Sequence, residues 1–157
     1  MIFVFFIKKV AKRLQSKSMK ENQYLFVYGT LLSEYGDVES HQWVKQYAVY
    51  IGKARMAAKM YMVDYYPGII PCQSGEKYIV RGELYRLIEP ENLFNLLDKY
   101  EEYNPMDAAH SEYVRKQTQV ELKNDKEIYT AWVYYFNQSV EDLEFMPKGD
   151  FLNEYHK

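Results

Sequence analysis

The sequence contains few of the residues that build disulfides and metal centres. Cys72 is the only cysteine among 157 residues, which excludes an intrachain disulfide and a cysteine-based metal cluster. A lone thiol also makes a reducing, cytoplasmic location the expected one. The three histidines, His41, His110 and His156, are scattered, so their spacing gives no support for a zinc or iron site. We therefore expect neither a metal nor another cofactor.

The chain also lacks a long apolar run and an excess of one charge. The apolar run at residues 2–7 is far shorter than the roughly 20 residues that a spanning helix needs. A signal peptide carries its charge before the apolar stretch, whereas Lys8 and Lys9 follow it here. The formal net charge is −2, with 20 basic and 22 acidic residues. This balance favours no nucleic-acid partner.

Residues 1–23 differ from the rest of the chain and are predicted to form a basic amphipathic extension. As a helix, this segment can dock on the domain or contact an anionic membrane surface through residues 1–18. Alternatively, translation begins at Met19, and the upstream segment carries no function. The apolar face of the helix would consist of Phe3, Ile7, Val10 and Leu14, and the basic face of Lys8, Lys9, Lys12 and Arg13.

From Tyr24 onward the sequence predicts one domain, residues 24–157, that is rich in strands. The 17 tyrosines favour β-structure, and the length allows one hydrophobic core. Helical patterns begin near Asp37 or Ser40 and at residue 89. About six strands and two helices predict an α+β fold built on a curled sheet or barrel. The expected strands cover 24–28, 48–55, 57–65, 77–87, 113–122 and 127–136.

Three short features interrupt this pattern. Gly82 lies inside an expected strand, which indicates a bulge or the close approach of another backbone. The sequence "YYPGIIP" at 65–71 has two prolines around a glycine and is expected to break the chain. The sequence "KNDK" at 123–126 reads as a hairpin loop between two strands.

The stretch 89–105, "EPENLFNLLDKYEEYNP", is predicted to be a helix with one acidic residue on its apolar side. Glu101 projects between Leu97 and Phe94, and burial raises the pKa of such a carboxyl toward neutrality, where it can exchange protons. Alternatively, the helix frays, and Glu101 reaches water or pairs with Lys99 or Arg115. The apolar arc is Leu93, Leu96, Leu97 and Tyr100 with Phe94 at its edge, and the solvated stripe is Glu91, Asn95, Asp98 and Glu102.

Several motifs together resemble one known family. "VYGTLL", "YYPGIIP", "VRGELY", "LLDKYEEYNP", "SEYVRKQTQVEL" and "MPKGDF" follow the order and spacing of the γ-glutamylcyclotransferase-like (AIG2-like) family, bacterial type, over residues 24–151. The resemblance implies a small mixed β-barrel flanked by helices. It also implies an enzyme that cyclises γ-glutamyl compounds to 5-oxoproline and releases an amine. Many members have glycine where this chain has Glu102, and a second charge there would disfavour ionised Glu101 if it turned inward.

The resemblance places candidate site residues on this sequence. Its acidic residue falls on Glu101, which agrees with the helical-face argument. Its turn is expected to offer backbone N–H groups to the substrate's α-carboxylate, although an ordinary strand-to-helix connection is the alternative. That turn is Tyr28, Gly29, Thr30 and Leu31.

Three residues elsewhere are weaker candidates. Tyr113 and Arg115 share a strand face where they can meet a carboxylate, with a rim salt bridge as the alternative for Arg115. Tyr66 either lines the mouth of the pocket or covers the end of the barrel.

The sequence is compatible with two classes of function. In the first, the substrate's own amine attacks its γ-carbonyl, and Glu101 acts as general base and then general acid, so no protein nucleophile such as Cys72 is needed. In the second, the barrel is a non-catalytic module that binds a small carboxylate or a partner. An inward acid together with an intact turn favours the enzyme.

Overall fold

A computed structural model describes residues 21–35 and 38–155 of the chain. The predicted amphipathic helix, the alternative start Met19 and the possible cap Asp37 lie outside these described residues. Within them, no helix combines the length and apolar character that crossing a membrane requires.

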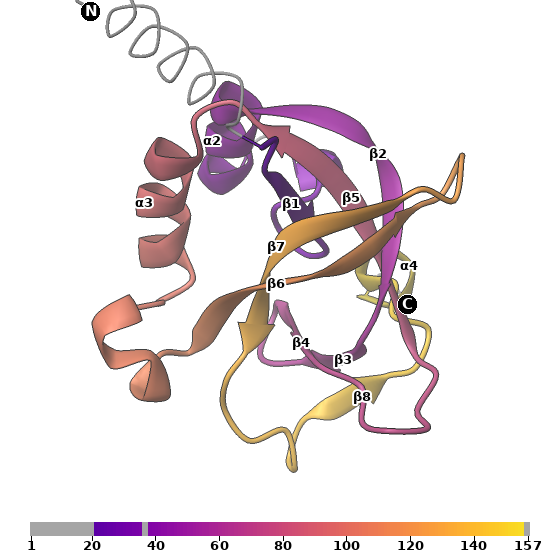
Figure 1. The fold of residues 1–157 in the computed structure, drawn as a ribbon. Coiled ribbons are helices and arrows are strands. Elements are labelled where there is room, and N and C mark those ends of the chain that lie inside the picture. The colour runs from indigo at the N-terminus through magenta and orange to yellow at the C-terminus, as the bar shows by residue number, and fades with distance from the viewer. Residues whose placement is uncertain (1–20, 36–37, 156–157) are drawn as a thin grey trace, which may run out of the picture.

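The fold is α+β, as predicted, and its main part is a closed barrel of five strands in the order β1-β5-β2-β6-β7 (Figure 1). Neighbouring strands are antiparallel except β1 and β7, which run parallel and meet at Leu25 and Trp132. The barrel strands are β1 (Tyr24–Val27), β2 (Ala48–Ala57), β5 (Ile79–Leu87), β6 (Tyr113–Leu122) and β7 (Ile128–Phe136).

A second sheet of three strands, in the order β4-β3-β8, lies at one end of the barrel. It consists of β3 (Lys59–Met62), β4 (Pro67–Ile70) and β8 (Glu144–Met146). The expectation that 65–71 only interrupts the chain was wrong, because Pro67–Ile70 pairs along its length with β3. The expected strand at 57–65 is correspondingly shorter. The short strand β8 was not predicted.

The helices pack on the outside of the barrel and are shorter than the sequence pattern predicted. Helix α2 (Glu39–Tyr47) begins after Val38, so the cap is not Ser40, which lies buried inside the helix. Helix α3 (Pro90–Tyr100) ends before Asn104-Pro105. The remaining helical segments in the described part are the 3₁₀ turns η1 (Ser33–Tyr35) and η2 (Pro105–His110) and the short helix α4 (Phe151–Tyr155).

Alternation along the strands divides the core into two clusters. Phe26 and Tyr28 point into the barrel, whereas Leu25 and Val27 point toward the helices. Helix α3 buries Leu93, Phe94 and Leu97 on the helix side, as its apolar arc predicted, but Tyr100 is exposed. The cluster inside the barrel and the cluster between the barrel and the helices are therefore adjacent at the end of β1.

Gly82 lies on β5 where the backbone of β1 comes close to it. A Cβ atom at this position would stand 2.0 Å from the carbonyl oxygen of Val27 on β1. The prediction of a close backbone approach is confirmed. The irregularity in register lies on the neighbouring strand β2, between Tyr50 and Gly52.

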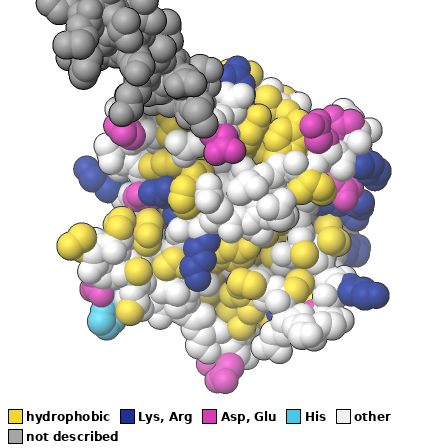
Figure 2. All heavy atoms as spheres, viewed as in Figure 1, with side chains coloured by type: hydrophobic (Ala, Val, Ile, Leu, Met, Phe, Trp, Pro, Cys, Tyr) yellow, Lys and Arg dark blue, Asp and Glu magenta, His cyan; other side chains and the backbone are white. Residues whose placement is uncertain are grey.

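Charges are mixed on the molecular surface. Figure 2 shows basic and acidic side chains both spread over the visible face, among hydrophobic ones. This face therefore presents no surface of one sign of the kind that binds a nucleic-acid backbone.

Candidate active site

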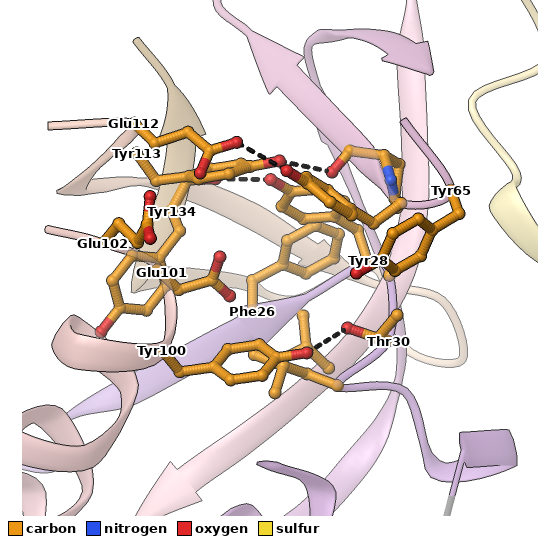
Figure 3. A pocket seen from close by; sticks show the side chains of 15 residues that line it. Phe26, Tyr28, Thr30, Tyr65, Tyr100, Glu101, Glu102, Glu112, Tyr113 and Tyr134 are labelled. Carbon is orange, nitrogen blue, oxygen red and sulfur yellow. Dashed lines mark hydrogen bonds between the residues drawn. The ribbon is translucent and has the colours of Figure 1, made fainter. Parts of the chain in front are cut away.

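A cavity of about 260 Å³ opens at the end of β1 (Figure 3). Its walls come from the turn after β1, the loop before β4, the end of α3 and the segment that leads into β6. The predicted residues Tyr28, Gly29, Thr30, Leu31, Glu101 and Tyr113 all line it, and so does Tyr66. The fold therefore brings together residues from distant motifs.

The turn after β1, residues 28–32 and hereafter the β1 turn, is closed by its own backbone. The N–H of Leu32 donates to the carbonyl of Gly29 at 2.9 Å. The carbonyl of Leu31 accepts a 3.0 Å hydrogen bond from Nδ1 of the buried His41. At Gly29 a Cβ would stand 2.8 Å from Pro67 Cγ, so a side chain there would collide with β4. Glycine thus lets the β1 turn pack closely against β4 beside the cavity.

The direction of Glu101 depends on how helix α3 ends. Glu101 is the C-cap, and Glu102 has φ 51°, in the left-handed region. The N–H of Glu102 donates to Lys99 O at 3.2 Å, and that of Tyr103 to Asp98 O at 2.8 Å. This is the Schellman arrangement of a helix C-terminus. It reverses the chain directly after Glu101, whose carboxylate points into the cavity (Figure 3).

The left-handed conformation at position 102 suits the glycine of the family pattern better than the Glu102 of this chain. A glycine adopts this conformation without the steric cost that a Cβ carries. The left-handed conformation costs a residue with a Cβ about 1–2 kcal/mol, and the larger chain entropy of glycine offsets part of the gain from removing it. We therefore expect Glu102→Gly to raise the free energy of unfolding by about 0.5–1 kcal/mol. Urea denaturation followed by circular dichroism would measure it. A glycine at exposed Asn95, inside the same helix, should instead destabilise, and stabilisation by both would contradict the explanation.

The environment of Glu101 favours its neutral form. Burial, and secondarily the like charge of Glu112, raise the pKa of Glu101 to about 8. Among residues 21–35 and 38–155, no side-chain hydrogen bond or ion pair reaches its carboxylate. The alternatives in which Glu101 pairs with Lys99 or Arg115 therefore do not describe this structure. A carboxyl with such a pKa is suited to gain and lose a proton near neutral pH.

The second acid of the site is Glu112, which the sequence pattern did not predict. Its backbone N–H donates to Glu102 O at 3.3 Å, and its carboxylate accepts from the Tyr66 hydroxyl at 2.7 Å. The like charge acting on Glu101 thus comes from Glu112, whereas Glu102 is exposed. Glu112 precedes the first residue of β6, so strand alternation gave no indication of its direction.

Buried tyrosines form the inner wall of the cavity. The Tyr28 hydroxyl donates to the carbonyl of Tyr134 at 2.7 Å, and the Tyr113 hydroxyl to that of Pro67 at 3.0 Å. Burial, more than the nearby acids, raises the pKa of both phenols. They therefore stay neutral at physiological pH. At the rim, the hydroxyls of Thr30 and Tyr100 are 3.1 Å apart.

Arg115 does not line the cavity. Its guanidinium bonds both carboxylate oxygens of Asp98, at 2.9 and 3.1 Å, and lies 3.9 Å from the ring centroid of Phe94. Asp98 also accepts from the Tyr134 hydroxyl at 2.6 Å and is 16% exposed, so it is not part of the solvated stripe as predicted. The alternative of a salt bridge fits Arg115, which ties α3 to the barrel.

No metal centre is indicated in the described part of the chain. There, no group of three or more His, Cys, Asp or Glu residues is arranged to hold a metal ion. His110 is exposed beside Asp107, and His156 lies outside the described residues.

Comparisons with known proteins agree with this fold. The model of a family described as gamma-glutamyl cyclotransferase, AIG2-like, matches residues 25–153. No curated protein sequence matches the chain significantly.

Solved structures with the same fold include bacterial and mouse proteins. YkqA from Bacillus subtilis superposes with a TM-score of 0.62 at 22% identity, over 87% of this chain and 44% of that one. This chain therefore spans less than half of YkqA. An AIG2-like protein from Mus musculus gives 0.60 at 18% identity, over 81% and 87% of the two chains. Protein ytfP from Escherichia coli gives 0.57 at 25%, over 86% and 100%.

Proposed function

Because this chain belongs to the gamma-glutamyl cyclotransferase, AIG2-like family, we propose that it cyclises a γ-glutamyl amine or γ-glutamyl amino acid to 5-oxoproline and releases the amine. The observation that carries this proposal is the Glu101 carboxyl in the cavity beside the β1 turn, which pairs with no side chain of the described residues and has its pKa raised to about 8. A module that only bound a carboxylate would have no need of such an acid.

The proposed reaction uses the substrate's own groups. Backbone N–H groups of the β1 turn hold the α-carboxylate, so that the α-amine and the γ-carbonyl approach in a five-membered ring. The amine nitrogen bonds to the γ-carbon, and the bond from that carbon to the leaving nitrogen breaks. Ionised Glu101 takes the proton from the attacking amine and delivers it to the leaving nitrogen. Atoms and charges balance without a protein nucleophile.

The charges of the residues that line the cavity affect which leaving group the site favours. The described lining includes Glu101, Glu102 and Glu112, and no Lys, Arg or His. Ionised carboxylates in the lining repel an anionic leaving group and attract a protonated one. We propose that neutral or cationic leaving amines are preferred.

Release of 5-oxoproline by the purified protein tests the proposed function. The panel should hold γ-glutamyl compounds with neutral, cationic and anionic leaving groups at equal concentrations. Release from neutral and cationic members, ahead of anionic ones, is the expected result. If the folded protein releases none from any member, the alternative of a carboxylate-binding module replaces the enzyme.

The pH dependence of kcat/KM follows from the pKa of Glu101. A general base must be ionised in the free enzyme, so activity should rise as pH passes through about 8. Glu112→Gln removes a like charge that disfavours ionised Glu101, and the rise should therefore move to lower pH. Initial rates between pH 5 and 10 on a substrate with a neutral leaving group would measure it.

The matched control is Glu102→Gln, which changes an exposed acid at the same rim. Glu102 is not among the groups that raise the pKa of Glu101, so the profile should keep its midpoint. An equal shift in both variants, or a shift to higher pH in Glu112→Gln, would contradict the assignment.

A further inference from the structure

We propose that Glu83, which lies outside the cavity, is a positioning residue that holds the β1 turn in its ligand-binding conformation. Glu83 is on β5 and is 0% exposed. It belongs to none of the groups assigned to the reaction above. The inference rests on the proposed function, because it assigns Glu83 a task in substrate binding.

Both oxygens of the Glu83 carboxylate accept hydrogen bonds from the residue after the β1 turn. The backbone N–H of Ser33 donates to Oε2 at 3.0 Å, and its hydroxyl donates to Oε1 at 2.5 Å. Each oxygen also has a second donor, Tyr85 OH at 2.8 Å and Lys53 Nζ at 3.2 Å. Four donors and a counter-charge are what a carboxylate needs in order to be fully buried.

Glu83 fixes the β1 turn at both of its ends. In the antiparallel pairing of β1 with β5, the partner of Glu83 is Val27, the last residue before the turn. The Glu83 side chain binds Ser33, the first residue after it. Residues 28–32 therefore form a loop whose two ends are attached to one residue of the barrel. Such double attachment removes conformational freedom that ligand binding would otherwise have to restrict.

The chemistry of the contact requires a carboxylate rather than another polar group. An amide offers one acceptor oxygen, and its NH₂ group would face donors. Hydrogen bonds to a charged acceptor are also stronger than those to a neutral one. Glutamine at position 83 would thus keep only part of the hydrogen bonding to Ser33, although its side chain has nearly the same volume as that of glutamate.

The Lys53 contact suggests a competing explanation in which Glu83 only joins strands. Lys53 lies opposite Glu83 in the pairing of β2 with β5, and its ammonium group also contacts Glu34 at 3.1 Å. In that case, loss of the ion pair between Lys53 and Glu83 would change KM and amide exchange in the turn, and loss of the Ser33 contacts would change neither. Lys53→Gln removes the ion pair with Glu83 and keeps the hydrogen bonds between Ser33 and Glu83, so it separates the two explanations.

The test compares Glu83→Gln with Lys53→Gln in steady-state kinetics and in amide hydrogen exchange of residues 29–33. The β1 turn holds the α-carboxylate in the ground state and the transition state alike, so Glu83→Gln should raise KM at least tenfold and change kcat less than threefold. Amide exchange in the turn should accelerate at least tenfold. Lys53→Gln removes the counter-charge of Glu83 and should lower stability, but it keeps both Ser33 contacts and should leave KM and amide exchange in the turn within about threefold of the wild-type values.

Each outcome decides the inference. Unchanged KM and unchanged exchange in folded Glu83→Gln would overturn it, and so would equal effects in Lys53→Gln. If Glu83→Gln does not fold, Ser33→Ala, which removes one of the two contacts, should raise KM and exchange in the same direction. No effect there would overturn the inference.

Failure of the proposed function has a different signature. The wild type would then release no 5-oxoproline, while faster turn exchange in Glu83→Gln but not in Lys53→Gln would still support the positioning role. If exchange in the turn is unchanged, the role is overturned whether or not the wild type is active.

Discussion

Replacing Glu101 by glutamine is expected to lower kcat for 5-oxoproline release by about 10²–10⁴-fold, the range for loss of a general acid–base group. Glutamine fills the same space but cannot take the proton of the attacking amine. The Schellman turn at Glu102 and Tyr103 involves only backbone groups, so the variant should keep its fold. Initial rates on a substrate with a neutral leaving group, with circular dichroism as a check on folding, would measure the loss.

The matched control for this result is Glu102→Gln, which should keep its activity within about threefold because its exposed side chain exchanges no proton in the proposed reaction. Similar losses in the two variants would contradict the role of Glu101.

A second readout separates catalysis from folding. Burial raises the pKa of Glu101 above its value in the unfolded chain. Its contribution to stability is therefore fully present below the unfolded pKa, falls progressively as pH rises, and is lost once pH has passed about 8. Glu101→Gln cannot ionise and should therefore be more stable than the wild type at pH 9. Lower stability of the variant at that pH would contradict the burial argument.

Gly82→Ala should produce the largest loss of stability among the variants considered. Its Cβ would stand 2.0 Å from Val27 O and 2.7 Å from Cζ of Phe26. Neither neighbour can move away easily, because Val27 is paired in the barrel and Phe26 is buried. We expect the free energy of unfolding to fall by about 3 kcal/mol, the upper end of typical overpacking costs. Urea denaturation followed by circular dichroism would measure the change.

Gly75→Ala provides the matched control, because an added Cβ at Gly75 causes backbone strain but meets no neighbouring atom, whereas at Gly82 it meets neighbouring atoms. Gly75 has φ +86°, but an added Cβ would meet no atom within 4 Å. The cost there is backbone strain alone, about 1–2 kcal/mol. A larger loss at Gly75 than at Gly82 would contradict the packing explanation.

Long strands were the part of the fold that the sequence predicted best. The strand at 113–122 has the predicted bounds, because it contains β-branched and aromatic residues and is followed by a polar hairpin loop. Strands β4 and β8 have only four and three residues and depend on pairing with β3, a tertiary contact that no local pattern contains.

The candidate site was predictable where one element decided the direction of a side chain. Glu101 follows the helical face even though α3 ends at Tyr100, because the C-cap continues nearly helical geometry for one more residue. Asp98 was placed wrongly because its partner, Arg115, comes from β6. Glu112 was missed because it belongs to no periodic element. In both cases the deciding contact joins segments distant in sequence.

The parallel contact between β1 and β7 has a consequence for synthesis of the protein. Leu25 cannot meet Trp132 until the ribosome has made β7. At roughly 5–20 residues per second, the strand that carries the β1 turn waits several seconds for this partner. During that time the edge of β1 that will contact β7 has unpaired backbone groups, which can bind other chains. Its pairing also requires the closure of a long loop, which slows folding. A chain that ends before residue 128 would therefore be prone to aggregation.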